Sequence, residues 1–415
     1  MNILANKRNL IFIGILLVSF ISWIISIFVG KTDGWAYNVF FSRTTDFLAD
    51  FLHNIDYVKD RNPYFDISNA STEHIYPPLA YAIFYLFSRI VIFPTSYPDI
   101  IYQAQFSIIF ILSIVFVILL FAIFLTTIGR NNRTKVSNVN NMEFILCVSF
   151  IFSYPVIFVI ERGNLLLLSV TFLAGFFAFY NSKSRLLREL SLIFLALAFA
   201  LKLSPAVFGL ILLSDKRVKD GIRCAIYGIL LFVSPFFLFH GGFFINLKKM
   251  AENIHSWNEI YKYLSGLGFF NTINVFVKIK LWTSTAPIVL TISRIIAVAM
   301  CILFVINIFL EKKQWKKVFM LTLITILLPY HVNPYNIIYF IPATLIFLLT
   351  ADRTIFNLIL MLVQSFLYNI FLYSFSDCYY NLVIPFLAIY FTIESIININ
   401  RCCSRAAGVN KNCIH

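Results

Sequence analysis

Charged residues are scarce in this chain: they make up 13% of 415 residues, whereas 60% are hydrophobic and 18% aromatic. Soluble domains of this length are not so apolar, and no polar stretch here is long enough to fold alone. Apolar runs of roughly 20 residues recur instead, each about long enough to cross a hydrocarbon core as a helix. We therefore predict an all-α polytopic membrane protein, one integral membrane domain over residues 1–415 with about 12 transmembrane helices.

Recognisable metal-binding and processing signals are also lacking. The seven cysteines show no spacing typical of a zinc site, so no metal ion is indicated. Lys7 and Arg8 precede an apolar run over residues 9–29 that is too long for the core of a signal peptide, and no small-residue cleavage site follows it. We expect this first helix to stay in the protein.

Basic residues outnumber acidic ones, and the net charge of +14 raises the question of nucleic acid binding. Their distribution argues against it, because many lie in short gaps between apolar runs. Under the positive-inside rule these gaps and both termini face the cytoplasm of a plasma membrane, close to lipid headgroups. The gap residues are Arg130, Arg133, Lys135, Lys183, Arg185, Arg188, Lys216, Arg217, Lys219, Arg223, Lys312, Lys313, Lys316 and Lys317.

Two longer polar segments, residues 31–100 and 240–285, then lie on the extracytoplasmic side. The run over residues 101–128 ends at the gap that begins with Arg130, so it returns inward and the short segment 76–93 cannot also cross. We interpret this segment as an amphipathic helix on the outer leaflet, with a true span as the alternative. Further crossings are predicted over residues 143–160, 165–180, 221–239, 287–310, 317–330, 336–350, 355–373 and 379–399.

The stretch between Arg188 and Asp215 has basic residues at both ends but is too short for two crossings. Its roughly 26 residues span only about 40 Å as helix. Two short helices that meet at Lys202 and Pro205 fit this length, because proline breaks the helical hydrogen-bond pattern.

Acidic residues concentrate in the loop after the first span, and Asp46 is the leading candidate for catalysis. An ionised carboxylate can act as general base toward a hydroxyl group. A solvated loop carboxylate is the plain alternative. Asp50 lies four residues on, on the same face if this stretch is helical, and the two carboxylates could share a divalent cation, although nothing else in the sequence demands one.

Three basic residues are expected on the same outer side as Asp46. Lys202 lies in an apolar stretch, where a charge is costly unless it faces a cavity or a partner. Arg162 and His331 lie in two outer turns. Cations gathered at one leaflet boundary suit a lipid-linked phosphate. The alternatives are a snorkelling Lys202, an Arg162 neutralised by Glu161 and a structural histidine.

The order of these motifs resembles the GT-C glycosyltransferases, and most closely glycosyltransferase family 87, the polyprenol-phosphate-mannose-dependent type. That family has an Asp-Phe pair after the first span, a later Pro-Tyr, a Tyr-Pro-Pro-Leu that opens the next helix, then Gly-Asn and Lys-x-x-Pro. The similar positions here, within roughly residues 40–240, are Asp46-Phe47, Pro63-Tyr64, Tyr76-Pro77-Pro78-Leu79, Gly163-Asn164, and Lys202 with Pro205. One departure is Asp50, which stands where the family usually has a tyrosine.

The resemblance implies a GT-C-type bundle with an outer juxtamembrane helix and a hexosyltransferase activity. The donor would be a polyprenyl phosphate carrying a mannose- or glucose-type sugar, and the acceptor a hydroxyl of a glycolipid or glycan outside a bacterial plasma membrane, with no separate cofactor. A polymerase of lipid-diphosphate-linked, O-antigen-type repeat units and a transporter are the alternatives. The expected roles are base for Asp46, donor-phosphate binding for Lys202, Arg162 and His331, and support for Asp50, Asn164, Tyr76 and Arg89.

Overall fold

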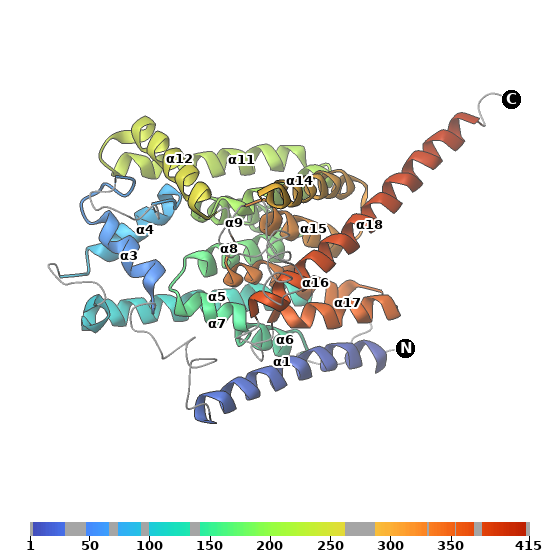
Figure 1. Ribbon diagram of the computed structural model, residues 1–415, viewed down its shortest axis with the longest axis horizontal. Coiled ribbons are helices and arrows are strands. Elements are labelled where there is room, and N and C mark those ends of the chain that lie inside the picture. The colour runs from blue at the N-terminus through green and yellow to red at the C-terminus, as the bar shows by residue number, and fades with distance from the viewer. Residues whose placement is uncertain are drawn as a thin grey trace.

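A computed structural model describes residues 3–29, 47–65, 74–92, 99–132, 142–261, 287–329, 332–352, 354–368 and 376–411. This described part is all-α and contains no strand, as predicted. Helices α1, α5, α11 and α17 run roughly along the long axis of the molecule, whereas α18, the longest helix, runs obliquely to them (Figure 1). Helices α3, α4 and α12 lie at the left-hand end of the bundle, whereas α1 begins and α18 ends on the right (Figure 1).

The helices follow the apolar runs closely. The short 3-10 helices are η1 (Asp99–Tyr102), η2 (Ser204–Gly209), η3 (Ser234–Leu238), η4 (Pro334–Tyr339) and η5 (Phe366–Tyr368). The α-helices are α1 (Ile3–Val29), α3 (Ala49–Val58), α4 (Pro78–Ser88), α5 (Ala104–Asn131), α6 (Met142–Ile151), α7 (Tyr154–Glu161), α8 (Leu166–Phe179), α9 (Arg185–Leu201), α10 (Leu210–Ser214), α11 (Val218–Val233), α12 (Gly242–Tyr261), α14 (Pro287–Leu310), α15 (Gln314–Leu327), α16 (Phe340–Thr350), α17 (Ile355–Ser365) and α18 (Ser376–Lys411).

Among the described residues, four helical segments are long and apolar enough to cross a membrane. They are α5, α11 continued by η3, and parts of α14 and α18, and the bent pair α6 and α7 brings the number to five if it forms one span. Several further apolar helices are shorter than a full span. The integral membrane character is thus supported, and the count of about 12 spans stays a prediction.

The span predicted over residues 143–160 is broken, which corrects the sequence-based expectation. Helices α6 and α7 meet at an angle of 46°. Pro155 lies in the first turn of α7 and has no N–H to donate to the carbonyl of Ile151, so the α6 hydrogen-bond pattern cannot continue through it. The segment between Arg188 and Asp215 agrees with its prediction, since α9 ends at Leu201 and η2 begins at Ser204.

Helix α4 has 11 residues and begins at Pro78, where the fixed φ of proline suits the first helical turn. Its length of about 16 Å is well short of a hydrocarbon core of about 30 Å. This agrees with a segment that does not cross. The second polar segment, predicted as a loop over residues 240–285, contains the 20-residue helix α12 in its described part.

Helices α3 and α4 of the first polar segment are held by a small aromatic core. Phe51 of α3 packs edge-on against Phe84 and Phe87 of α4, with ring centroids 5.2 and 5.0 Å away, and against Phe110 of α5 at 4.8 Å. Burying such side chains is the main source of stability for a short helix. This packing fixes α3 on the end of the bundle.

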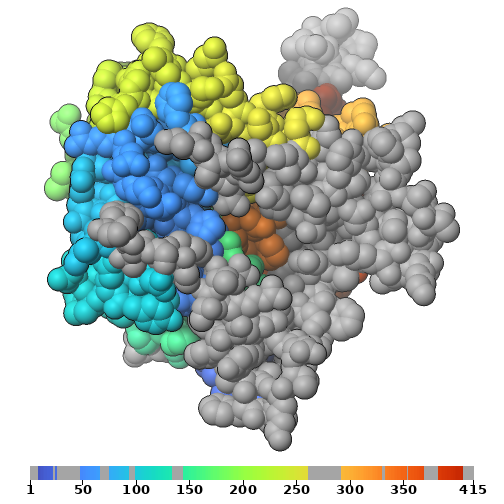
Figure 2. All heavy atoms as spheres, turned by 60° about the vertical axis from the view of Figure 1, so that its left-hand side comes forward, coloured from blue at the N-terminus to red at the C-terminus, as the bar shows by residue number. Residues whose placement is uncertain are grey.

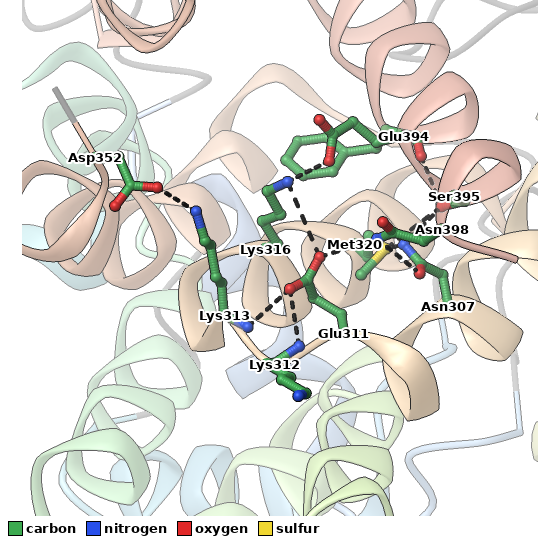
Figure 3. A network of polar contacts seen from close by, with 11 residues as sticks. Asn307, Glu311, Lys312, Lys313, Lys316, Met320, Asp352, Glu394, Ser395 and Asn398 are labelled. Atoms are coloured by element: carbon green, nitrogen blue, oxygen red, sulfur yellow. Dashed lines mark hydrogen bonds and ion pairs between the residues drawn. The ribbon is translucent and has the colours of Figure 1, made fainter. Parts of the chain in front are cut away.

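Basic residues of the short gaps meet at the other end, where α1 begins. Arg8 of α1 donates to the carbonyl of Ala351 at 3.2 Å, and Lys313 pairs with Asp352. Figure 3 shows the network that joins α14, α15 and α18 there, in which Glu311 accepts from the backbone of Lys312 and Lys313 at 2.8 Å. The gap between α14 and α15 thus lies beside the start of α1 and the end of α16, and the assignment of this face to the cytoplasm stays a prediction.

Candidate functional site

The turn between α7 and α8 is closed by a glycine in the left-handed region. Gly163 has φ +62° and donates to the carbonyl of Ile160 at 2.9 Å, while the N–H of Asn164 donates to Val159 at 3.1 Å. This is the Schellman arrangement that ends many helices. The Asn164 side-chain oxygen then accepts from the N–H of Leu166 at 2.9 Å, which caps the start of α8.

Helix α3 docks directly on this turn through its backbone. The N–H of Leu48 donates to the carbonyl of Glu161 at 2.8 Å, and that of Asp50 donates to Arg162 at 3.1 Å. Leu48 itself has φ 55°, an uncommon conformation for a non-glycine residue that marks the tight approach. The first polar segment and the α7–α8 turn therefore form one unit.

A polar cluster results at their contact. Arg162 Nη2 lies 2.6 Å from Asp50 Oδ1, and Asn164 Nδ2 lies 2.7 Å from Asp50 Oδ2. The same Asn164 nitrogen approaches the hydroxyls of Tyr76 at 3.0 Å and Tyr335 at 3.4 Å. Asn164 is only 5% exposed, so these contacts satisfy an amide that would otherwise be costly to bury.

Lys202 completes the cluster from the break between α9 and η2. Its ammonium group lies 3.9 Å from the centroid of the Tyr76 ring, a cation–π contact, and the side chain is half-buried. No carboxylate of the described residues forms an ion pair with it, in contrast to Arg162, which Asp50 pairs. Lys202 is thus a partly desolvated positive charge without a counter-ion, whereas the charge of Arg162 is neutralised by Asp50.

Burial and charge set the protonation of the surrounding groups. Burial, and after it the nearby Asp50 charge, raises the pKa of the Tyr76 hydroxyl well above its ordinary value, so this group stays neutral. Burial lowers the pKa of Arg162, but the charge and hydrogen bond of Asp50 more than offset this and raise it overall. Both groups therefore keep their protons at any physiological pH.

An apolar cavity of about 100 Å³ adjoins the polar cluster. Ile83 and Phe87 of α4, Phe110 and Ile114 of α5, and Asn164 line it. Figure 2 shows the same end of the molecule, where green and orange atoms, the colours of the α7–α8 and η4–α16 regions, lie in a hollow beside the blue atoms of α3. A ligand with an apolar chain and a charged head would find both environments here.

The structure brings together five of the predicted site residues, which are Asp50, Tyr76, Arg162, Asn164 and Lys202. Asp46 and His331 lie outside the described residues. Arg89 is not part of the cluster, because it contacts Tyr85 on the surface of α4. Arg162 is paired with Asp50.

Tyr335 and Asn333 were missed by the sequence-based reasoning. Asn333 Nδ2 donates to the Tyr335 hydroxyl at 2.8 Å, and this hydroxyl reaches Asn164. A signal was present, since Asn-Pro-Tyr occurs at residues 62–64 and again at 333–335. Within the described residues, no group of three or more His, Cys, Asp or Glu side chains lies close enough to hold a metal ion.

The long apolar helices indicate an integral membrane protein, and the buried polar cluster lies at one end of its bundle. Comparison with protein families identifies the family: the model of glycosyltransferase family 87 matches residues 74–332, and the chain belongs to that family. It is therefore a membrane glycosyltransferase. A comparison with curated proteins finds no match.

Proposed function

We propose that this glycosyltransferase is of the GT-C type and moves a mannose- or glucose-type sugar from a polyprenyl phosphate to an acceptor hydroxyl on the extracytoplasmic side. The observation that carries the proposal is the Lys202 ammonium group, half-buried over Tyr76 and without an ion-pair partner among the described residues. A partly desolvated cation attracts an anionic ligand far more strongly than one in water. A phosphate is the anion that a lipid-linked sugar donor provides.

The charges of the cluster favour one phosphate. Asp50 and Arg162 cancel each other at 2.6 Å, so Lys202 contributes the net positive charge next to Tyr76. Lys202 would bind the donor phosphate and stabilise the charge that develops on it as the sugar leaves. Arg162 would act mainly by neutralising Asp50, whose unpaired charge would repel the donor.

In the proposed reaction, a bond forms between the acceptor oxygen and the anomeric carbon, and the bond from that carbon to the phosphate oxygen breaks. The acceptor proton passes to Asp46 as general base, and the polyprenyl phosphate leaves as the anion. Leu48 follows Asp46 by two residues in the chain, and its N–H donates to the carbonyl of Glu161, the residue before Arg162. This anchor supports a base close to the cluster, and His331 would add a second phosphate contact.

The apolar cavity supports a lipid-linked donor. It is lined by α5 residues such as Phe110 and Ile114, and α5 also carries highly exposed apolar residues, among them Ile111 and Leu112. Such a helix surface belongs in contact with lipid. The donor chain would approach along α5 from the bilayer, because each CH₂ group kept from water contributes about 0.8 kcal/mol.

The test is donor binding to the purified protein in detergent, with radiolabelled polyprenyl-phosphate mannose and glucose as probes. Lys202→Ala should weaken binding by about 1.5–3 kcal/mol, the usual worth of a hydrogen bond to a charged group. Lys183→Ala is the matched control, since Lys183 is exposed and lies in a gap predicted to face the cytoplasm. Unchanged affinity in Lys202→Ala would refute the assignment of the phosphate to this cluster.

A double-mutant cycle separates two roles for Arg162. Arg162→Ala alone should also weaken donor binding, because it leaves the Asp50 carboxylate unpaired. If Arg162 acts by neutralisation, adding Asp50→Asn should restore much of the lost affinity. If the guanidinium instead contacts the phosphate, the double variant should bind no better than Arg162→Ala.

A further inference from the structure

Two arginines from different segments converge on one tyrosine on the outside of α4. Arg61 Nε donates to the Tyr85 hydroxyl at 2.7 Å, and its guanidinium carbon lies 5.2 Å from the ring centroid. Arg89 donates to the same hydroxyl, with its guanidinium carbon 4.5 Å from the centroid. Both arginines are exposed, and neither forms an ion pair or hydrogen bond with Asp50 or Lys202.

This cluster holds two like charges with no acidic partner among the described residues. The nearby carboxylates are Asp56, which pairs with Lys59 at 2.7 Å, and Asp60, which forms no ion pair with either arginine. Hydrogen bonds, the first from Arg89, lower the pKa of the Tyr85 hydroxyl, which reflects the concentrated positive charge. Two guanidiniums that face the same point suit an anion with several oxygens, such as a phosphate.

The backbone of Arg61 is fixed in an unusual conformation. Its φ is 57°, in the left-handed region that non-glycine residues rarely occupy. The Arg61 carbonyl accepts from the N–H of His240 at 3.0 Å, and its own N–H donates to Val58 at 3.0 Å. The junction of η3 and α12 thus holds Arg61 in place, and such conformations persist where the surrounding structure enforces them.

The elements that carry or hold these arginines have exposed apolar side chains. Leu86, next to Tyr85 on α4, is 67% exposed. The η3–α12 junction that binds Arg61 carries Phe237 at 71% and Phe244 at 81% exposure. Exposed guanidiniums and large exposed apolar side chains on connected elements are typical of a surface that lies at the boundary of lipid tails and headgroups.

We propose that Arg61, Tyr85 and Arg89 form a binding site for the phosphate of a membrane phospholipid headgroup. The arginines bind the phosphate, and Leu86, Phe237 and Phe244 rest against the acyl chains. The site anchors α4 at the level of the headgroups and is distinct from donor binding, so it can fail or hold independently of the proposed transferase mechanism.

The experiment measures lipid bound to the full-length protein by native mass spectrometry in a phosphate-free maltoside detergent. Phosphatidylglycerol is titrated in one arm, inorganic phosphate in a second, and diacylglycerol, which lacks a phosphate, in a third. The test variant is Arg61→Gln with Arg89→Gln. The control is Lys248→Gln with Lys249→Gln, which removes two charges from exposed positions of α12 that pair with Glu252.

We expect phosphatidylglycerol to bind the wild type and the control equally, and the test variant to bind it about tenfold or more weakly, since two charge-assisted hydrogen bonds are lost. Tyr85→Phe gives a second variant should the first fold poorly, and it should weaken binding because both arginines lose their common acceptor. Equal binding by wild type and both test variants would overturn the proposal. So would diacylglycerol binding as tightly as phosphatidylglycerol, or inorganic phosphate binding as tightly as the lipid, because the apolar rim would then contribute nothing.

Discussion

Gly163 is the point at which the α7–α8 turn, helix α3 and the polar cluster depend on one another. A Cβ atom at this position would lie 2.9 Å from the Cβ of Phe51 and 3.2 Å from a methyl carbon of Leu48. The first distance is well inside ordinary carbon contact, and Phe51 is held between α4 and α5. Gly163→Ala must therefore displace α3.

Two costs combine in this variant, and two other glycines separate them. An alanine in the left-handed region costs about 1–2 kcal/mol, and the displacement of packed neighbours about 1–3 kcal/mol more. Gly242 also has a positive φ of +67° but no atom within 4 Å of an added Cβ, so Gly242→Ala carries the first cost alone. Gly209 has neither feature, and Gly209→Ala should leave stability nearly unchanged.

The assay is thermal unfolding of the detergent-purified variants, followed by donor binding on those that stay folded. Melting temperature should fall in the order Gly209→Ala, Gly242→Ala, Gly163→Ala. Only Gly163→Ala should also weaken donor binding, because moving α3 separates Asp50 from Arg162 and Asn164. Equal stability of Gly163→Ala and Gly242→Ala would show that α3 does not approach the turn as closely as described, and the reasoning would be wrong.

Two further predictions concern the base and the topology. Asp46→Asn should leave expression and donor binding near wild type and reduce turnover by on the order of 10²-fold or more, measured as sugar transfer from the radiolabelled donor; full activity would exclude Asp46 as the base. A single cysteine at Asn132, at the end of α5, should not react with a membrane-impermeant thiol reagent in intact cells, and labelling there would place the basic gap outside.

Helix positions were largely predictable because they depend on neighbours in the chain. The apolar run over residues 287–310 coincides with α14, and the break between α9 and η2 falls at the predicted Lys202 to Pro205 segment. Proline acts on the hydrogen bond within its own helix, so its effect is local and visible in the sequence. The bend at Pro155 shows the same effect where the apolar pattern alone predicted one straight span.

The site was only partly predictable. Lys202 was predicted because a charge within an apolar run is costly unless it has a function or a partner. Asn164 was predicted because it follows Gly163 in a Gly-Asn turn. Tyr335 did not differ from its sequence surroundings in this way, since the chain contains 21 tyrosines. Its role depends on η4 lying against α7, where its ring is 5.6 Å from that of Phe158.

Composition and the spacing of charges by themselves determined the class of this protein: an all-α chain whose apolar runs need lipid and whose basic residues concentrate in the gaps between those runs. These properties follow from transfer free energies and from hydrogen bonds closed within a few residues. The tertiary structure alone decided that Asp50 pairs with Arg162, that Asn164 joins it to Tyr76 and Tyr335, and that Lys202 keeps no such partner within the described residues. Those hydrogen bonds join positions between 88 and 171 residues apart, and directional hydrogen bonds of about 3 Å form between them only after the helices have packed.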